Sequence, residues 1–539
     1  MMAQEPVQRG DSRVFDLLFD NGLIVDGTGN PGLTGSVGVR DDSLVIVRGD
    51  PTRFDARKRV DATGLVISPG FIDIHAHSGL LLLADKNHDA KVRQGVTTEL
   101  VGIDGLSYAP FTRKQDLLAL VRMNSGLDGD PPLDYDWGTV SEYLELFDGA
   151  SPVNVALIVG NTALRINALG WSNTPPTQAA LTEMRAMLRS AMEEGAFGLS
   201  TGLDYPPGSY ADTAELVALS REAAKLGGFY HTHVRYRLGD RYLDPHREAI
   251  EIGKLSGIPV HITHLAPRNS YPSAHGLLDL VESAAADGVD ITFDSIPLYP
   301  GATRLLILFP DWMHEGGPEE LKARLSDSKV RARLRAEMNS GDDAGWQDMW
   351  LTNFESNGNG SFSGQTAEQI ANARSQHPID MLCDLLIEED LRVSFSYMNA
   401  DLRNLPRFLA HPRAMAASDA VLVGDHPPHR TYASFISMLS DYSRDEPVMS
   451  MTDAIRKMTS MPAQRMGLGD RGILRDCYKA DLVVFDPQLV GSKATRSDPK
   501  RYADGVTHVV VNGVQVIENG ARTPANPGRT LRFRTGAHV

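Results

Sequence analysis

The stretch Ser68-Pro-Gly-Phe-Ile-Asp-Ile-His-Ala-His-Ser78 is the starting point for interpreting this sequence. Pro69 and Gly70 mark its beginning, and the apolar residues around them are typical of a buried parallel strand. Because successive side chains of a strand point to opposite faces, His75 and His77 stand on the same side and can bind one cation. Paired histidines also occur in strands without a metal. Other motifs in the chain are needed to distinguish a metal site from a pair of structural histidines.

Composition is that of an ordinary globular protein. The 539 residues are 42% hydrophobic and 23% charged, which suits one large domain with a smaller one, or three modest domains. The formal net charge is −16 and no long basic run occurs, so we expect neither nucleic acid nor a membrane as partner. Cys383 and Cys477 are the only cysteines, which excludes a disulfide framework and a zinc site made of thiolates.

The N-terminal residues lack the apolar core of a signal peptide, and no run approaches the roughly 20 apolar residues of a membrane span. We therefore expect a cytoplasmic, soluble protein. The sequence leaves its oligomeric state open, a homo-oligomer included.

The two ends of the chain have the pattern of β-structure. Residues 14–67 contain short apolar runs separated by turn signals, and the same pattern returns from 474 to 539. We expect these two segments to form one small β-sandwich-like domain.

Between them, residues 68–473 alternate apolar strands with amphipathic helices, which predicts a parallel sheet. Strands are expected near 70–77, 96–103, 154–160, 196–201, 229–235, 258–264, 289–295 and 419–425. Eight strands predict an α/β fold of the (β/α)₈ TIM-barrel type, with the active site at their C-terminal ends. A further strand, Arg392 to Tyr397, is assigned to an insert at 303–395 near strand seven. An insert of this length is typical of a lid or a substrate-binding subdomain.

Histidines and aspartates gather at the expected strand ends and would converge on one cavity. They are His75, His77, Asp104, His231, His233, His261, His264 and Asp425. Taken singly, Asp104 can be a turn residue, and His231 or His261 can simply orient neighbours. Taken together they predict a metal site.

Nitrogen and oxygen ligands without a thiolate suit Zn²⁺ best, with Mn²⁺, Co²⁺ or Fe²⁺ as alternatives. Zinc lowers the pKa of a bound water to about 7, and a nearby carboxylate can pass the proton to a leaving amine. Asp425, at the end of the last expected strand, is the candidate for that carboxylate.

The stretch around His75 resembles the first-strand motif of the amidohydrolase superfamily. Further stretches look like the D-aminoacylase (N-acyl-D-amino-acid deacylase) family, and the resemblance extends from Phe15 to Arg532. These stretches are Arg93-Gln-Gly-Val-Thr-Thr-Glu99, Ser200-Thr-Gly-Leu-Asp-Tyr-Pro-Pro-Gly208, His233-Val-Arg235, Val260-His-Ile-Thr-His-Leu265 and Met458-Thr-Ser-Met-Pro-Ala-Gln-Arg-Met-Gly-Leu468.

The resemblance implies a zinc-dependent deacylase with one or two metal ions, in which metal-bound hydroxide splits an N-acyl-D-amino acid into a carboxylate and a free D-amino acid. It implies that His75 and His77 bind one metal, and that His233 and His264 bind the second or the only one. Asp425 is then the general acid/base and a metal ligand. The resemblance gives His231 and His261 supporting positions behind the ligands.

Two departures from the family pattern concern the site. The usual Gly-Asn-Cys-Gly motif is here Gly102-Ile-Asp-Gly105, so Asp104 is expected to bind or bridge the metal. The fourth strand has no lysine, which argues against a carbamylated-lysine bridge. Ala266 stands where family members commonly have a lysine that is associated with the substrate carboxylate. A buried anion needs a partner.

Residues that would contact the substrate follow from these departures. Arg235, Arg304 or Arg430 could replace the missing lysine, and Tyr205 and Tyr299 are expected in the pocket. Ala266 and Leu298 also motivate an alternative substrate, a hydrophobic or aromatic N-acyl amide or a cyclic amide. A third hypothesis is an inactive barrel used for binding. In the first two, the partner is a small-molecule N-acyl amide.

Overall fold

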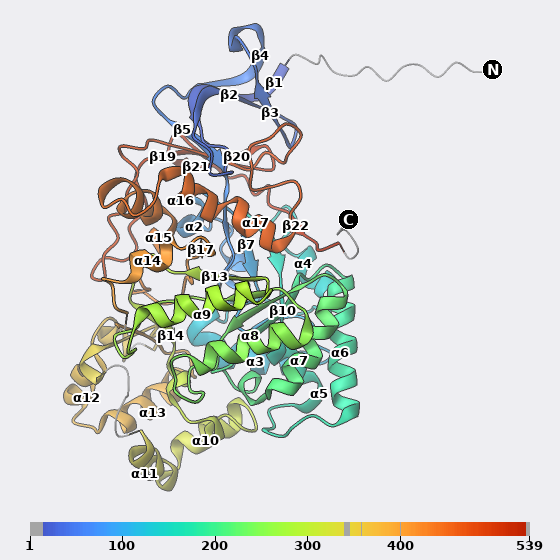
Figure 1. The fold of residues 1–539 in the computed structure, drawn as a ribbon. Helices are drawn as coiled ribbons and strands as arrows, with labels where there is room; N and C mark the ends of the chain where they lie inside the picture. Colours follow the sequence, from blue (N-terminus) through green and yellow to red (C-terminus); the bar gives the residue numbers. More distant parts are fainter. Residues whose placement is uncertain (1–13, 339–344, 357, 399, 535–539) are drawn as a thin grey trace.

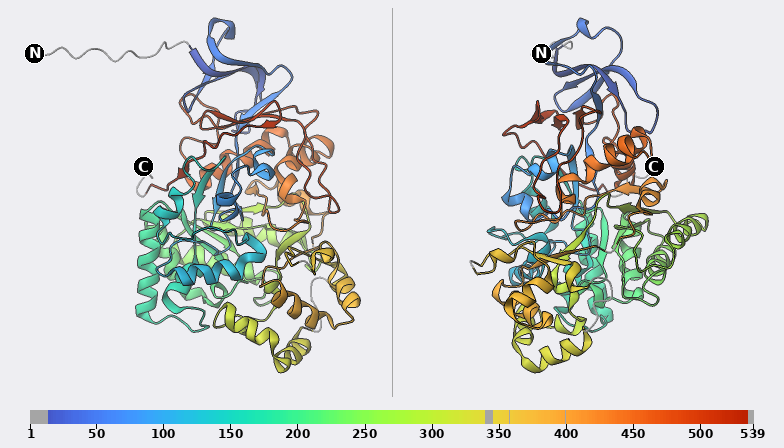
Figure 2. Two further views of the ribbon diagram at one scale, coloured as in Figure 1. Left: turned by 180° about the vertical axis from the view of Figure 1, so that it is seen from behind. Right: turned by 90° about the vertical axis from the view of Figure 1, so that its left-hand side faces the viewer.

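The computed structural model describes residues 14–338, 345–356, 358–398 and 400–534 (Figure 1). A barrel occupies the centre, a small sheet made from both ends of the chain lies at one end, and an inserted helical unit lies at the other (Figures 1 and 2). In the described residues, we find no helix both long and apolar enough to cross a bilayer. The cytoplasmic location and the domain boundaries stay predictions.

Short parallel strands form the barrel, and β8 and β9 share one of its eight positions. The strands are β6 (Phe71–Asp73), β7 (Val96–Val101), β8 (Asn154–Leu157), β9 (Val159–Gly160), β10 (Gly198–Gly202), β11 (Phe229–His233), β12 (Val260–Ile262), β13 (Ile291–Ser295) and β17 (Ala414–Ala416). Neighbouring strands pair in parallel. A parallel bridge between Ala76 and Ala420 joins the last position to the first. The predicted (β/α)₈ barrel is confirmed.

The eighth strand lies earlier in the chain than the sequence predicts. It is β17, which has three residues and pairs with β13 through Phe293–Ala414 and Ser295–Ala416. The expected strand 419–425 is instead loop with a single bridge residue. This shift changes which carboxylate lies at the end of the strand.

Helices cover the outside of the barrel (Figure 1). They are α1 (Leu81–Ala84), α2 (Asp89–Val92), α3 (Lys114–Asp128), α4 (Val140–Glu145), α5 (Asn161–Leu169), α6 (Gln178–Glu193), α7 (Thr213–Lys225), α8 (Asp244–Ser256), α9 (Ala274–Ala286), α14 (Leu405–Ala410), α15 (Arg430–Leu439), α16 (Met451–Met458) and α17 (Ser460–Met466). Asp212 caps α7 by accepting a hydrogen bond from the Glu215 backbone N–H at 2.8 Å. Helical segments return the chain between successive parallel strands, so the C-terminal ends of the strands meet at one face of the barrel.

The small sheet contains strands from both ends of the chain. They are β1 (Val14–Ile24), β2 (Leu33–Arg40), β3 (Ser43–Val47), β4 (Asp55–Asp61), β5 (Val66–Pro69), β18 (Leu482–Phe485), β19 (Val506–Val511), β20 (Val514–Glu518) and β21 (Ala521–Arg522). Strand β5 joins the two parts, because it pairs with β1 on one side and with β18 on the other. It leads directly into β6. The last strand, β22 (Thr530–Leu531), leaves this sheet and pairs with β8 of the barrel.

The insert has a sheet and a hydrophobic core of its own. Its elements are β14 (Gly301–Arg304), α10 (Pro318–Ser326), α11 (Ser328–Glu337), β15 (Met349–Thr352), α12 (Ala367–Arg374), α13 (Pro378–Glu388) and β16 (Ser394–Tyr397). Strand β16 pairs antiparallel with both β14 and β15. The extra strand expected at 392–397 therefore belongs to the insert, as predicted, and Leu321, Leu382 and Leu386 lie buried beneath it.

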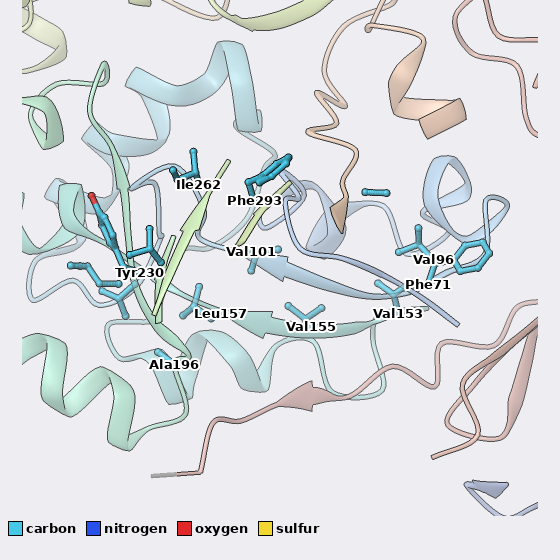
Figure 3. Close-up of a cluster of buried hydrophobic side chains, with 14 of the residues drawn as sticks. Phe71, Val96, Val101, Val153, Val155, Leu157, Ala196, Tyr230, Ile262 and Phe293 are labelled. Atoms are coloured by element: carbon cyan, nitrogen blue, oxygen red, sulfur yellow. The ribbon is translucent and has the colours of Figure 1, made fainter. Parts of the chain in front are cut away.

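The barrel core is apolar, as its sequence pattern indicates. Figure 3 shows Val101, Leu157, Ile262 and Phe293 among buried side chains of neighbouring strands. Burying one such side chain contributes about 1.5 to 3 kcal/mol. This packing holds the strand ends in fixed positions, and the polar cluster described next lies on them.

Candidate metal centre

The two histidines of the first strand lie side by side just beyond β6. Both are buried, and their ring centroids are 5.6 Å apart. The backbone N–H of His75 donates to Asp73 Oδ1 at 3.2 Å, which fixes the chain where the strand ends. The structure therefore brings His75 and His77 together, as predicted, although both lie just after the end of the strand.

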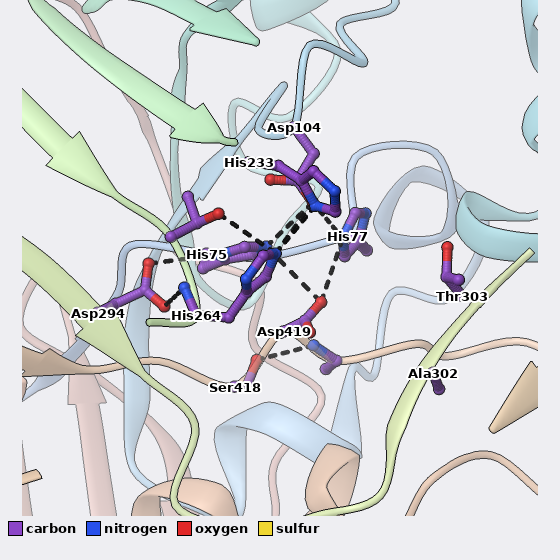
Figure 4. A network of polar contacts seen from close by, with 12 residues as sticks. His75, His77, Asp104, His233, His264, Asp294, Ala302, Thr303, Ser418 and Asp419 are labelled. Carbon is purple, nitrogen blue, oxygen red and sulfur yellow. Dashed lines mark hydrogen bonds and ion pairs between the residues drawn. The ribbon is translucent and has the colours of Figure 1, made fainter. Parts of the chain in front are cut away.

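Asp104 faces all four histidines of the cluster, which Figure 4 shows together with it. Its Oδ2 is 3.6 Å from His75 Nε2, 3.8 Å from His77 Nε2, 3.6 Å from His233 Nδ1 and 4.0 Å from His264 Nε2. The side chain is buried, and its Oδ1 has no hydrogen-bond partner among the described residues. One carboxylate thus faces both histidine pairs.

The second histidine pair comes from the ends of β11 and β12. His233 Nδ1 and His264 Nε2 are 3.0 Å apart. The other ring nitrogen of each is held from behind: His233 Nε2 lies 3.1 Å from Asp204 Oδ2, and His264 Nδ1 lies 3.1 Å from the Tyr236 hydroxyl. Partners of this kind are typical of metal-binding histidines, whose orientation they fix.

Asp419, rather than Asp425, brings the second carboxylate to the cluster. Asp419 Oδ1 is 3.3 Å from His77 Nε2 and 3.6 Å from His75 Nε2. The Asp425 side chain is 87% exposed, and its nearest ion-pair partner is Lys500 at 3.8 Å. The predicted position of Asp425 in the site is wrong, because the eighth strand ends at Ala416 and the next carboxylate along the chain is Asp419.

Charge in the cluster favours a bound cation. Burial opposes the ionised form of Asp419, but Arg430 and the two histidines lower its pKa to about 2. Burial also opposes protonation of His77, yet Asp128 and Asp419 raise its pKa to about 9. The pKa of Asp104 is held well below its usual range by His75 and His233, against the effect of burial. The histidines and Arg430 thus supply positive charge beside these ionised carboxylates, and a cation bound here would take the place of the protons on the histidines.

His231 and His261 lie behind the cluster. His261 Nε2 is 3.1 Å from Asp294 Oδ2, the oxygen that also lies 3.4 Å from His75 Nδ1. His231 Nε2 contacts the Ile74 carbonyl at 3.1 Å. Burial lowers the pKa of both rings, so they are neutral supports.

Three supporting carboxylates escape the sequence reasoning: Asp128, Asp204 and Asp294. Asp128 Oδ1 lies 2.8 Å from His77 Nδ1, and Asp294 Oδ1 accepts the His264 backbone N–H at 2.7 Å. Asp294 could have been found, because it lies next to the end of an expected strand. Asp128 ends helix α3, and its sequence carries no such signal.

The donor set fits one or two metal ions. His75, His77 and Asp104 have donor atoms within 4.8 Å of one another, and so do Asp104, His233 and His264. His75 Nε2 is buried and has no hydrogen-bond partner among the described residues, as expected for an atom that points at an ion. All donors are nitrogen or oxygen, which suits zinc.

Comparison with known proteins agrees with this geometry. Residues 58–517 match the model of the amidohydrolase family. The chain belongs to this family. It is 30% identical to a D-aminoacylase of Alcaligenes xylosoxydans xylosoxydans over 98% of the chain and all of that protein. It is 31% identical to an N-acyl-D-glutamate deacylase of the same organism, over 96% of each chain.

Solved structures agree with this assignment. A crystal structure of D-aminoacylase has a TM-score of 0.78 at 30% identity, covering 96% of this chain and all of that one. An N-acyl-D-glutamate deacylase from Bordetella bronchiseptica, complexed with zinc and a phosphonate inhibitor, has a TM-score of 0.81 at 29% identity with the same coverage. The resemblance drawn from the sequence motifs is confirmed.

The cluster of this amidohydrolase opens into a cavity of about 520 Å³. His77, Asp104 and Asp419 lie in its wall, together with Tyr205 and Tyr299. The two tyrosines expected in the pocket are therefore present.

The arginines expected in the pocket do not line it. Arg235 pairs with Glu248 at 3.2 Å, and Arg304 donates to the Met123 carbonyl at 2.8 Å. Arg430 is buried and donates to Asp419 Oδ2 at 2.9 Å, so it holds the carboxylate of the cluster. The arginines in the cavity wall are instead Arg237, Arg241 and Arg268.

Proposed function

We propose that this amidohydrolase cleaves the amide bond of N-acyl-D-amino acids and releases a carboxylate and a free D-amino acid. The observation that carries the proposal is the position of Asp419, whose Oδ1 lies 3.3 Å from His77 Nε2 in the wall of the cavity. The D-aminoacylase and N-acyl-D-glutamate deacylase relatives, similar over nearly the full chain, support the choice of substrate.

We infer that His75, His77, Asp104, His233 and His264 hold zinc, with Asp104 facing both histidine pairs. A zinc ion held there would polarise an amide carbonyl and would lower the pKa of a water molecule. The bound zinc of the N-acyl-D-glutamate deacylase neighbour supports this choice of metal.

Asp419 is the proposed general base and acid. Its pKa of about 2 keeps it ionised at neutral pH. Arg430 binds Oδ2, and Oδ1 faces the histidines. As water adds to the amide carbon, Asp419 accepts its proton; it then donates that proton to the nitrogen when the carbon–nitrogen bond breaks. Atoms and charge balance, and Asp419 returns to its ionised state.

The test compares Asp419→Asn with Asp425→Asn. Asparagine has nearly the same shape but cannot carry the proton, so we expect kcat for Asp419→Asn to fall by roughly 10² to 10⁴-fold. Asp425→Asn should match the wild type, because that side chain is 87% exposed. Metal analysis of both variants shows whether zinc is retained.

Chirality tests the substrate assignment. We expect N-acetyl-D-amino acids to be hydrolysed and their L-enantiomers to react far more slowly. Equal turnover of the two enantiomers would contradict the D-amino acid proposal, and full activity of Asp419→Asn would contradict the mechanism.

A further inference from the structure

Arg268 is a cation in the cavity wall without an acidic partner among the described residues. It follows β12 and Pro267, and its backbone forms an antiparallel bridge with Ala400. The guanidinium carbon lies 3.8 Å from the centroid of the Tyr236 ring. In the described part of the chain, no carboxylate lies within ion-pair distance of it. A half-buried guanidinium that lies against aromatic rings in a cavity wall can take up an anion.

The neighbouring arginine of the cavity is already engaged. Arg237 donates to the Ile307 carbonyl at 2.7 Å and lies 3.9 Å from Asp311. Arg268 contacts aromatic rings instead, with its guanidinium also 5.8 Å from the ring of Tyr271. Stacking fixes the plane of the guanidinium and leaves its N–H edge available for a planar anion.

Arg268 lies one aromatic ring away from the metal centre. Tyr236 carries Arg268 on its face and contacts His264 Nδ1 through its hydroxyl at 3.1 Å. The Tyr236 and His264 rings are stacked, with centroids 6.0 Å apart. An anion bound by Arg268 would therefore lie near the reacting amide.

The α-carboxylate of the substrate lies close to the amide bond that is cleaved. In an N-acyl amino acid, three bonds separate the acyl carbonyl carbon from the carboxyl carbon, about 3 to 4 Å in space. A guanidinium binds a carboxylate through two parallel N–H···O bonds of about 2.7 to 2.9 Å. Arg268, His264 and Asp104 line the same cavity, so a carboxylate bound at Arg268 would hold the amide within that cavity.

We propose that Arg268 binds the α-carboxylate of the substrate and makes this amidohydrolase selective for N-acyl amino acids over neutral amides. The proposal rests on the proposed function and names the residue that confers its selectivity. Ala266 lies in the same cavity wall and contributes only a methyl group, so it supplies no cation there.

The experiment compares N-acetyl-D-leucine with N-acetyl-D-leucinamide, in which a neutral carboxamide replaces the carboxylate. For Arg268→Met we expect the ratio of kcat/KM for the acid to kcat/KM for the amide to fall at least 30-fold, mainly through KM for the acid. Arg268→Lys keeps the charge but not the planar fork, so it should recover part of the ratio.

Arg403→Met is the matched control. Arg403 belongs to the segment after Ala400 that runs beside Arg268, and its side chain is 90% exposed. It should keep the wild-type ratio. Zinc content and melting temperature of all variants are measured, and the Lys variant provides a test if the Met variant does not fold.

The outcomes separate the two proposals. Wild-type hydrolysis of N-acetyl-D-leucine, with an unchanged ratio in Arg268→Met, would overturn the role of Arg268 and leave the proposed function standing. A fall in the acid-to-amide ratio in Arg241→Met but not in Arg268→Met would also overturn the role of Arg268. A loss of activity in Arg268→Met that is confined to N-acetyl-D-glutamate would overturn it too, because Arg268 would then bind a side-chain carboxylate. A wild-type protein that cleaves neither the D-acid nor the amide would overturn both proposals.

Discussion

Lys91 is a buried cation that should fix the positions of residues in the candidate metal centre. It lies on α2 and is fully buried. Its ammonium contacts the carboxylate of Asp73, the Ser418 hydroxyl at 2.6 Å and Glu99 Oε1 at 3.3 Å. Asp73 in turn accepts the backbone N–H groups of His75 and Ser418, each at 3.2 Å. One ammonium therefore links the first strand to Ser418, which precedes Asp419, the proposed general base.

Lys91→Met keeps most of the side-chain volume and removes the charge. Asp73 and Glu99 are both 0% exposed, so the variant leaves buried carboxylates with less compensating charge. Breaking a buried pair in this way costs about 3 to 5 kcal/mol. We expect the free energy of unfolding to fall by this amount. We also expect kcat to fall by about 10 to 100-fold, because small shifts of catalytic groups are costly.

Urea unfolding and steady-state kinetics test this prediction. The control is Lys254→Met, whose salt bridge to Asp287 is exposed and should contribute less than about 1 kcal/mol. Adding Asp73→Asn to Lys91→Met should recover part of the stability, because it removes one uncompensated charge, with a coupling of about 1 to 3 kcal/mol. Wild-type stability and kcat in Lys91→Met would refute the reasoning.

Three further predictions concern pH, metal affinity and metal removal. Burial lowers the pKa of His246 to about 4, so between pH 6.5 and pH 4 the unfolded state binds more protons than the folded state, and the protein becomes less stable as the pH is lowered. His246→Gln can still donate a hydrogen bond to the Tyr242 carbonyl. In urea titrations it should match the wild type at pH 7 and be more stable than the wild type by about 2 kcal/mol at pH 5. An unchanged pH slope would contradict this. Asp204→Asn removes the carboxylate 3.1 Å from His233 Nε2 and should weaken zinc binding about 10 to 100-fold in chelator competition, whereas an unchanged affinity would argue against His233 as a ligand. Chelation should lower the free energy of unfolding by about 4 kcal/mol relative to protein with zinc at 1,000 times its Kd, and a melting temperature insensitive to zinc would count against the site.

The barrel could be predicted from the sequence because most of its strands are apolar runs followed by amphipathic helices. The last strand could not. Strand β17 is only Ala414–Ala416, too short and too small in its side chains to give a signal. The apolar residues Val421 and Val423, which have strong β-propensity, are buried in a loop. Tertiary packing outweighs local β-propensity there. Because the sequence predicts the eighth strand too late in the chain, it also predicts Asp425 rather than Asp419 as the base.

Asp104 is both a turn residue and a candidate metal ligand. It has a φ of 52° within a turn whose glycines, Gly102 and Gly105, have φ of 83° and 72°. A Cβ on Gly102 would lie 2.1 Å from the Ile158 carbonyl oxygen, so this close approach requires glycine. The turn residue and the candidate ligand are the same residue, because the turn is what directs Asp104 into the cluster.

The supporting groups follow a rule that the sequence could not reveal. Three of the four candidate histidine ligands have a carboxylate behind them, since Asp294, Asp128 and Asp204 contact His75, His77 and His233. These contacts join distant segments and depend on tertiary packing.

His264 differs, because its partner is the phenol of Tyr236, which carries Arg268 on its face. The candidate ligand without a carboxylate behind it is thus the one closest to Arg268. A substrate carboxylate bound to Arg268 would add negative charge near His264. The metal centre and the proposed carboxylate site therefore share Tyr236, and substitutions of Tyr236 should affect zinc affinity and substrate KM together.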